Sequence, residues 1–167
     1  MNFLNSKFYL VRTGVVLVFA LCLFSFSGCS SEKKITEPEV LEVISMIEAA
    51  TKNKDPDAIV ANLSEKVQIK LTVTADGQTQ HFTFDRSQYG EYLKKAFAVV
   101  SDYTYSRQTT HVKISADGKS AIASDEIMES MTLNGKLIRS VSTEVATFVR
   151  ENGKLVILLL EATGKQN

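Results

Sequence analysis

The chain has 167 residues, of which 19 are acidic and 19 are basic, so its formal net charge at neutral pH is zero. This balance, without any basic run, argues against nucleic acid as a partner. Its two cysteines are Cys22 and Cys29, and the long stretch after Cys29 has none, which excludes a disulfide-stapled fold and a cysteine-based metal or redox site there.

The first 28 residues have the pattern of a secretory signal. Lys7 and Arg12 precede an uncharged, largely apolar run over residues 13–28, which is too short for a convincing membrane span. The run leads into Phe-Ser-Gly-Cys at positions 26–29, which resembles the lipobox of bacterial lipoproteins, although Phe26 stands where Leu is usual. The resemblance implies that Cys29 becomes the diacylglyceryl-modified first residue of the mature chain. An uncleaved anchor helix and an ordinary signal peptide are the alternatives.

We therefore expect three parts: a lipoprotein signal peptide over residues 1–28, a lipidated Cys29 with a short tether over 29–35, and a single domain over 36–167. Acyl chains would hold the protein on a membrane. The residue after Cys29 is Ser30 and not an acidic residue of the kind that marks inner-membrane retention. The resemblance thus implies a lipid-anchored protein of the bacterial cell envelope, with the periplasmic side of the outer membrane preferred.

Three helices are predicted from their capping signals. The first starts at Thr36, which forms a capping box with Glu39, and the second starts at Asp55 followed by a proline. The third starts at Asp85 with Gln88 three residues later and runs to about residue 101. Apolar residues at helical spacing define the buried side of each helix. They are Val40, Leu41, Ile44, Ile47 and Ala50; Ala58, Ile59 and Leu63; and Tyr89, Leu93, Ala96, Phe97 and Val100.

The remaining segments are predicted to be strands. A hairpin from Val67 to Phe84 turns at Asp76-Gly77, between the second and third helices. Residues 103–163 then contain four strand-forming runs, separated by turns at Asp117-Gly118, Asn134-Gly135 and Asn152-Gly153. Asp-Gly and Asn-Gly are strong hairpin signals because both residues accept a positive φ. These turns predict a meander of four long antiparallel strands.

This order of elements predicts an α+β fold in which a curved antiparallel sheet wraps on N-terminal helices. With the Asp-Pro-Asp-Ala start of the second helix at 55–58 and the closing strand pair over 149–157, the chain resembles the nuclear-transport-factor-2-like superfamily, which includes the SnoaL-like proteins. The resemblance covers residues 36–163, and Leu155 stands where many relatives have Trp. It implies a cone with a pocket in its open mouth. Some members are isomerases, dehydratases or hydrolases, and many only bind ligands or dimerise.

Alternation along the meander divides it into two faces, and a β-bulge would exchange them over part of a strand. We assign the face containing Ser106, Gln108, Glu126, Met128, Glu144 and Phe148 to the inside of the cone. The opposite face, with Arg107, Asp125 and Glu129, is assigned to solvent or to a subunit contact. The candidate pocket residues are Tyr105, Ser106, Gln108, Glu126, Met128, Glu144 and Phe148, with Tyr105 as an aromatic cap.

Two carboxylates in this set suggest chemistry. Glu126 and Glu144 would divide into acid and base if burial raised one pKa; otherwise they are rim charges balanced by Arg107 or Lys70. The only histidines, His81 and His111, are expected at the surface, and two histidines without a nearby cluster make a poor zinc site. No nucleophile elbow or phosphate-binding loop is present, and no cofactor is expected.

Three functions remain open. We favour a membrane-anchored envelope lipoprotein whose non-catalytic cone binds a small apolar ligand or a protein partner. The alternatives are an isomerase or dehydratase that uses Glu126 or Glu144 with Tyr105 or Gln108 polarising the substrate, and a structural dimerisation module. The unbroken apolar run over residues 155–160 needs cover on both faces, which predicts a homodimer through the outer face of the sheet.

Overall fold

Three helices and six strands follow one another along residues 33–166, the part of the chain that the computed structural model describes. The predicted lipobox and Cys29 lie outside the described residues. The elements are α1 (Glu37–Lys52), α2 (Pro56–Val60), β1 (Leu63–Ala75), β2 (Gln78–Phe84), α3 (Arg86–Val99), β3 (Val100–Ile114), β4 (Ser120–Leu133), β5 (Lys136–Glu151) and β6 (Lys154–Gln166). None of the helices in this range is long and apolar enough to cross a lipid bilayer.

All three predicted helix starts are confirmed. Thr36 and Glu39 form the capping box of α1, Asp55 accepts a hydrogen bond from the amide of Ala58 at the start of α2, and Asp85 caps α3. Leu63, however, was expected on the second helix and instead opens β1. The helix ends early because the Asn62 carbonyl accepts a bond of 3.0 Å from the amide of Ile157, which pairs this stretch with β6.

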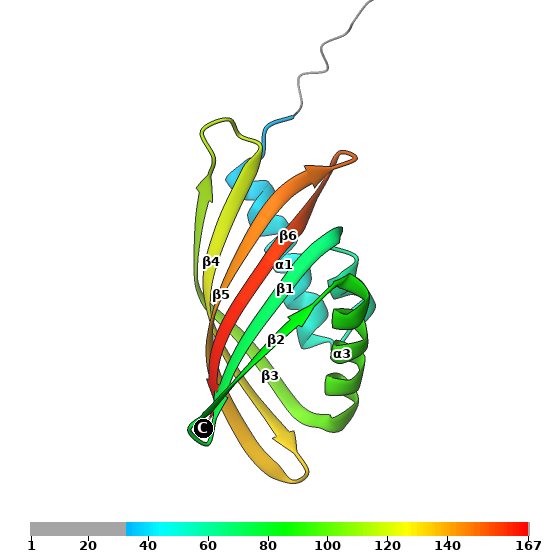
Figure 1. The fold of residues 1–167 in the computed structure, drawn as a ribbon, viewed down its shortest axis with the longest axis vertical. Helices are drawn as coiled ribbons and strands as arrows, with labels where there is room; N and C mark the ends of the chain where they lie inside the picture. The colour runs from blue at the N-terminus through cyan, green and yellow to red at the C-terminus, as the bar shows by residue number, and fades with distance from the viewer. Residues whose placement is uncertain (1–32, 167) are drawn as a thin grey trace, which may run out of the picture. The chain divides into compact units, whose positions relative to one another are not determined.

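The predicted hairpins and the four-strand meander are also confirmed. Asp76, Asn134 and Asn152 have φ values near +50°, and each is followed by a glycine with positive φ. The complete sheet is nevertheless mixed, with the order β2-β1-β6-β5-β4-β3 (Figure 1). The predicted curved sheet packed on N-terminal helices is confirmed, and its one departure from an antiparallel sheet is the pairing of β1 with β6, which is parallel. Helix α3 carries the chain to the far edge of the sheet, and the meander returns so that β6 runs parallel to β1.

The core fills one end of the curved sheet, where α1 packs on it. Phe148, Ile69 and Val40 are fully buried there, and α1, α2 and α3 meet around Ala50, Ile59 and Leu93. At this end lie the β3–β4 and β5–β6 turns; the β1–β2 and β4–β5 turns lie at the other (Figure 1). We call the end with the β3–β4 and β5–β6 turns the closed end, because the core fills the space there.

Candidate functional site

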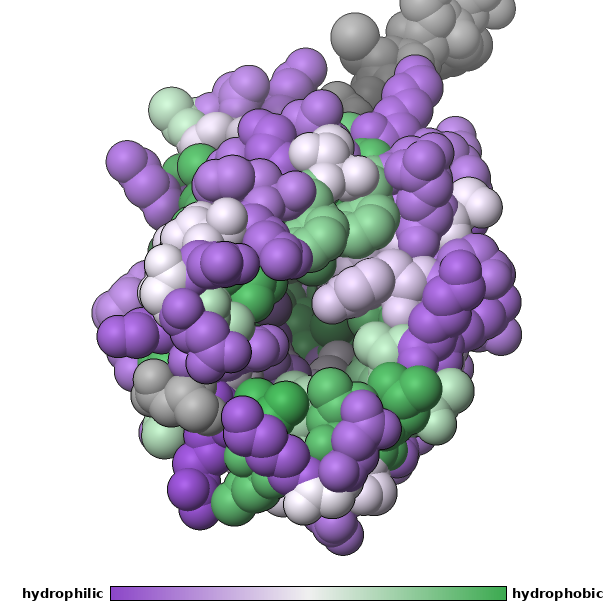
Figure 2. All heavy atoms as spheres, turned by 60° about the horizontal axis from the view of Figure 1, so that its bottom comes forward, coloured by the Kyte–Doolittle hydropathy of each residue, from purple (hydrophilic) through white to green (hydrophobic). Residues whose placement is uncertain are grey.

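The end of the domain opposite the core contains a cavity of about 270 Å³. Its wall comes from the three helices and from every strand except β2, with Val73, Val100, Met131 and Gln166 near the ends of four strands. Figure 2 looks toward this end and shows a hollow among hydrophobic side chains, inside a mostly hydrophilic surface. We call this opening the mouth.

Most of the cavity wall is apolar, but strands β3, β4 and β5 give it a polar side. That side carries Tyr103, Tyr105, Glu129, Ser140, Ser142 and Glu144. The Tyr103 hydroxyl donates a short hydrogen bond to Glu129, which also accepts one of 3.4 Å from Ser140. The Glu129 carboxylate is therefore already occupied by protein donors.

The Glu144 carboxylate is different, because among residues 33–166 no hydrogen bond or ion pair holds it. Burial raises its pKa from 4.5 to about 7; the Arg107 guanidinium opposes this rise, and the charges of Glu129 and Asp125 add to it. A carboxyl group with this pKa can both accept and donate a proton near neutrality. It is the side chain of the cavity best suited to proton transfer.

A buried ionic group supports this polar side. An Arg107 Nη atom forms a short ion pair with Asp125, and their side chains are only 9% and 3% exposed. Asp125 also accepts a bond of 2.6 Å from Thr110, while the other Nη atom of Arg107 donates to the Tyr105 hydroxyl at 2.8 Å. Because the Tyr105 oxygen accepts from Arg107, its own hydrogen is available to donate to a ligand in the cavity.

The tyrosines of the cavity remain neutral donors. Burial raises the pKa of Tyr89, Tyr103 and Tyr105 above the ordinary value of 10. For Tyr89 and Tyr105 the negative charge of Glu144 is the next cause. These hydroxyls therefore provide hydrogen-bond donors over the whole physiological range of pH.

The structure divides the candidate pocket residues into three groups. Tyr105 and Glu144 line the cavity, and Phe148 is fully buried in the core. The other four have exposed side chains and do not line the cavity: Ser106, Gln108, Glu126 and Met128. Glu126 and Glu144 are thus not brought together as a carboxylate pair.

For β4 the assignment of faces is reversed, and for β3 it changes within the strand. Residues directly opposite each other in a ladder share a face, and Asp125 pairs with Glu144. On β3 the register shifts between Arg107 and Thr109, so the inward positions change from odd numbers to even ones there.

Sequence reasoning missed three residues of this site: Arg107, Asp125 and Glu129. For β4 a signal existed, because the two-residue turn at Asn134-Gly135 fixes the register of both flanking strands. Counting outward from that turn places Asp125 and Glu129 on the face of Glu144 and Ser140. The bulge of β3 has no comparable signal.

Neither histidine contributes to the cavity. His81 contacts Thr72 across the β1–β2 hairpin at 3.1 Å, and His111 is exposed on β3. Within residues 33–166 no group of three or more His, Cys, Asp or Glu side chains is arranged to hold a metal ion.

Comparison with known proteins shows the fold. No family model matches the chain, and no curated protein matches it by sequence. Solved structures do match. An NTF2-like protein of unknown function from Pseudomonas putida is 13% identical with a TM-score of 0.61, over 76% of this chain and 84% of its own. A ketosteroid isomerase-like protein from Erwinia carotovora is 12% identical with a TM-score of 0.58, over 76% and 94%. A type 2 hexachlorocyclohexane dehydrochlorinase is 7% identical with a TM-score of 0.60, over 75% and 82%.

Proposed function

Because the domain has the nuclear-transport-factor-2-like fold, with a cavity open at one end, we propose that it binds a small, mainly apolar molecule carrying one polar group. The observation that carries this proposal is the cavity itself, whose apolar wall has one polar side. The apolar part of a ligand would replace water along the wall. Its polar group would receive a hydrogen bond from Tyr105 and lie against Glu144.

A second function, proton-transfer catalysis of the isomerase or dehydratase type, is favoured by Glu144. Its pKa of about 7 is close to the value at which a general acid or base is most effective. In this proposal Glu144 removes a proton from a carbon next to a carbonyl group and returns it at a second position. Tyr105 donates a hydrogen bond to the carbonyl oxygen, on which negative charge develops.

Native mass spectrometry of the domain purified gently from cells tests the binding proposal. We expect extra mass on the wild-type domain and its loss in Ala162→Leu, because Ala162 lines the cavity directly opposite Glu144 on the neighbouring strand. Thr163→Leu is the matched control, since Thr163 is exposed on the same strand. Extra mass that persists in Ala162→Leu would place the bound molecule elsewhere.

Anchoring to the bacterial envelope through a lipid on Cys29 is part of the proposal. It is supported by the sequence around Cys29, with a small residue before the cysteine and an apolar run upstream. The lipid would place the domain on a membrane surface, with the periplasmic face of the outer membrane preferred.

We also propose that two copies pair through the outer face of the sheet. Met128 and Val141 face each other on neighbouring strands and are 47% and 44% exposed, and Ile122 on the same face is 45% exposed. We expect the domain to sediment as a dimer at micromolar concentration and Met128→Asp to sediment as a monomer, because a buried charge at this contact would be unpaired. A monomeric wild type would contradict the pairing.

A further inference from the structure

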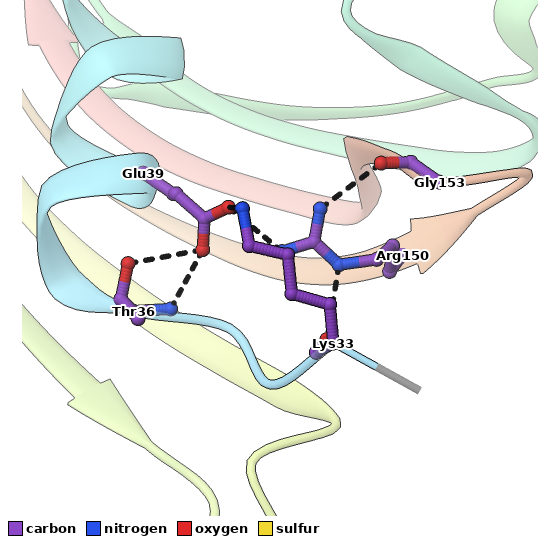
Figure 3. Close-up of polar contacts among 5 residues, drawn as sticks. All are labelled: Lys33, Thr36, Glu39, Arg150 and Gly153. Atoms are coloured by element: carbon purple, nitrogen blue, oxygen red, sulfur yellow. Dashed lines mark hydrogen bonds and ion pairs between the residues drawn. The ribbon is translucent and has the colours of Figure 1, made fainter. Parts of the chain in front are cut away.

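The chain is fastened to the domain before its first helix begins. The guanidinium of Arg150, at the end of β5, holds three groups (Figure 3). Its Nε donates to the carbonyl of Lys33 at 3.2 Å, and its two Nη atoms donate to the carbonyl of Gly153 and to Glu39, both at 3.0 Å. The side chain of Arg150 is only 10% exposed. One buried cation thus joins the start of the described chain to α1 and to the β5–β6 turn.

Glu39 completes this arrangement. It accepts from the Lys33 ammonium at 2.7 Å and from the amide and hydroxyl of Thr36 at 3.1 and 2.9 Å. The bond from Lys33 is the main reason that the pKa of Glu39 is lowered to about 2, so the carboxylate is charged at any physiological pH. Lys33, Thr36, Glu39, Arg150 and Gly153 form what we call the clamp.

A second fastening lies beside the clamp, at the β3–β4 turn. The Ile35 amide donates to the Gly118 carbonyl at 2.8 Å, and the Ile35 side chain is 3% exposed. Gly118 has a φ of +74°, and a Cβ atom there would lie 2.9 to 3.0 Å from side-chain carbons of Lys34. Only glycine leaves room for this contact. Residues 33–35, assigned to the tether from the sequence, are therefore fixed to the domain.

Both fastenings are at the closed end, opposite the mouth (Figure 1). Strand β5 covers this separation with 16 residues, which corresponds to roughly 50 Å along the strand. Only residues 30–32 separate Cys29 from Lys33, so the intervening chain spans at most about 14 Å. A tether this short, attached at the closed end, cannot turn the mouth toward the surface that holds Cys29.

We infer that the closed end, formed by the clamp and the β3–β4 and β5–β6 turns, is the surface that meets the lipid bilayer, so that the mouth opens away from it. The inference rests on the proposed lipidation of Cys29. It adds that the ligand enters from the aqueous compartment or from a partner there, and does not move directly from the supporting bilayer into the cavity.

Fluorescence quenching on vesicles tests this orientation with the lipidated chain. After Cys29 the sequence has no cysteine, so Ala116→Cys in the β3–β4 turn and Lys136→Cys at the start of β5, next to the β4–β5 turn, each give one labelling site at an exposed position. Each labelled protein is bound to phosphatidylethanolamine–phosphatidylglycerol vesicles that contain a lipid with a quencher on its headgroup. We expect several-fold stronger quenching at position 116 than at position 136. Equal quenching, or stronger quenching at position 136, would overturn the orientation.

Two further measurements show whether a failed quenching test is due to missing lipidation or to a wrong orientation, and whether the clamp sets the orientation. If the chain lacks the acyl mass and does not float with the vesicles, the lipidation of Cys29 is overturned, and the inference with it. If the protein floats but position 136 is quenched as strongly as position 116 or more strongly, only the orientation is overturned.

Arg150→Gln, which loosens the clamp, should reduce the difference in quenching between the two labels. Arg139→Gln, at an exposed position of the same strand, should not. An unchanged difference in Arg150→Gln would show that the clamp does not set the orientation.

Discussion

Replacing Arg107 with methionine is expected to lower the free energy of unfolding by about 3–5 kcal/mol, because it leaves a buried carboxylate without its cation. The Asp125 side chain is 3% exposed and would keep only its bond from Thr110. The Tyr105 hydroxyl would also lose the donor that holds it in place. Urea unfolding at neutral pH measures the change.

The double variant Arg107→Met/Asp125→Leu separates loss of the ion pair from loss of packing. Because it removes both charges, it should recover much of the stability lost in the single variant. Lys113→Met, at an exposed position of the same strand, serves as the control and should change stability by less than about 0.5 kcal/mol. If Arg107→Met were no more harmful than this control, the ion pair would be accessible to water and would not support the site.

Glu144→Gln is expected to slow any proton transfer strongly while making the domain more stable at alkaline pH. The pKa of Glu144 is raised from 4.5 to about 7, so the folded state favours the protonated carboxyl group. This contribution to stability is complete below about pH 4.5, declines as pH rises, and is lost above about pH 7. The neutral amide avoids the loss, and at pH 8 Glu144→Gln should exceed the wild type by roughly 1–3 kcal/mol.

Thermal or urea unfolding across pH 4 to 8 checks this effect, and Glu126→Gln on the exposed side of β4 is the matched control. If the domain is an enzyme, turnover of its substrate should fall by about 10²–10⁴-fold in Glu144→Gln and remain in Glu126→Gln. A wild-type stability profile that matches that of Glu144→Gln between pH 5 and 8 would contradict a buried, proton-accepting Glu144. Gain of stability with loss of activity would instead indicate that Glu144 is retained for function.

What could be predicted from the sequence depended on how local the signal was. Helix starts at Thr36, Asp55 and Asp85 are each encoded within four residues, and so are the Asp-Gly and Asn-Gly turns. For this reason the order of elements and the fold were predictable. The parallel pairing of β1 with β6 was not, because no local pattern states which distant strand will lie beside β1.

The candidate site was predictable only in part, for a similar reason. Of the candidate pocket residues, Glu144 and Tyr105 line the cavity, but the pairing of Arg107 with Asp125 depends on two strands and a bulge. A change of one residue in register exchanges the two faces of a strand. The chemistry of the cavity, which needs Arg107, Asp125 and Glu144 on one face, was therefore visible only in three dimensions.

The parallel pairing in the middle of the sheet also determines how the domain can fold. Lys70 on β1 and Glu161 on β6 form an ion pair although 91 residues separate them, and β6 lies between β1 and β5. Hairpins can form early, but the sheet cannot be completed until the latest of its strands inserts between two that were made before it. Such dependence on distant contacts slows folding. Until β6 is in place, the edges of β1 and β5 that will pair with it have no hydrogen-bonded neighbour. During that interval the chain is most exposed to aggregation.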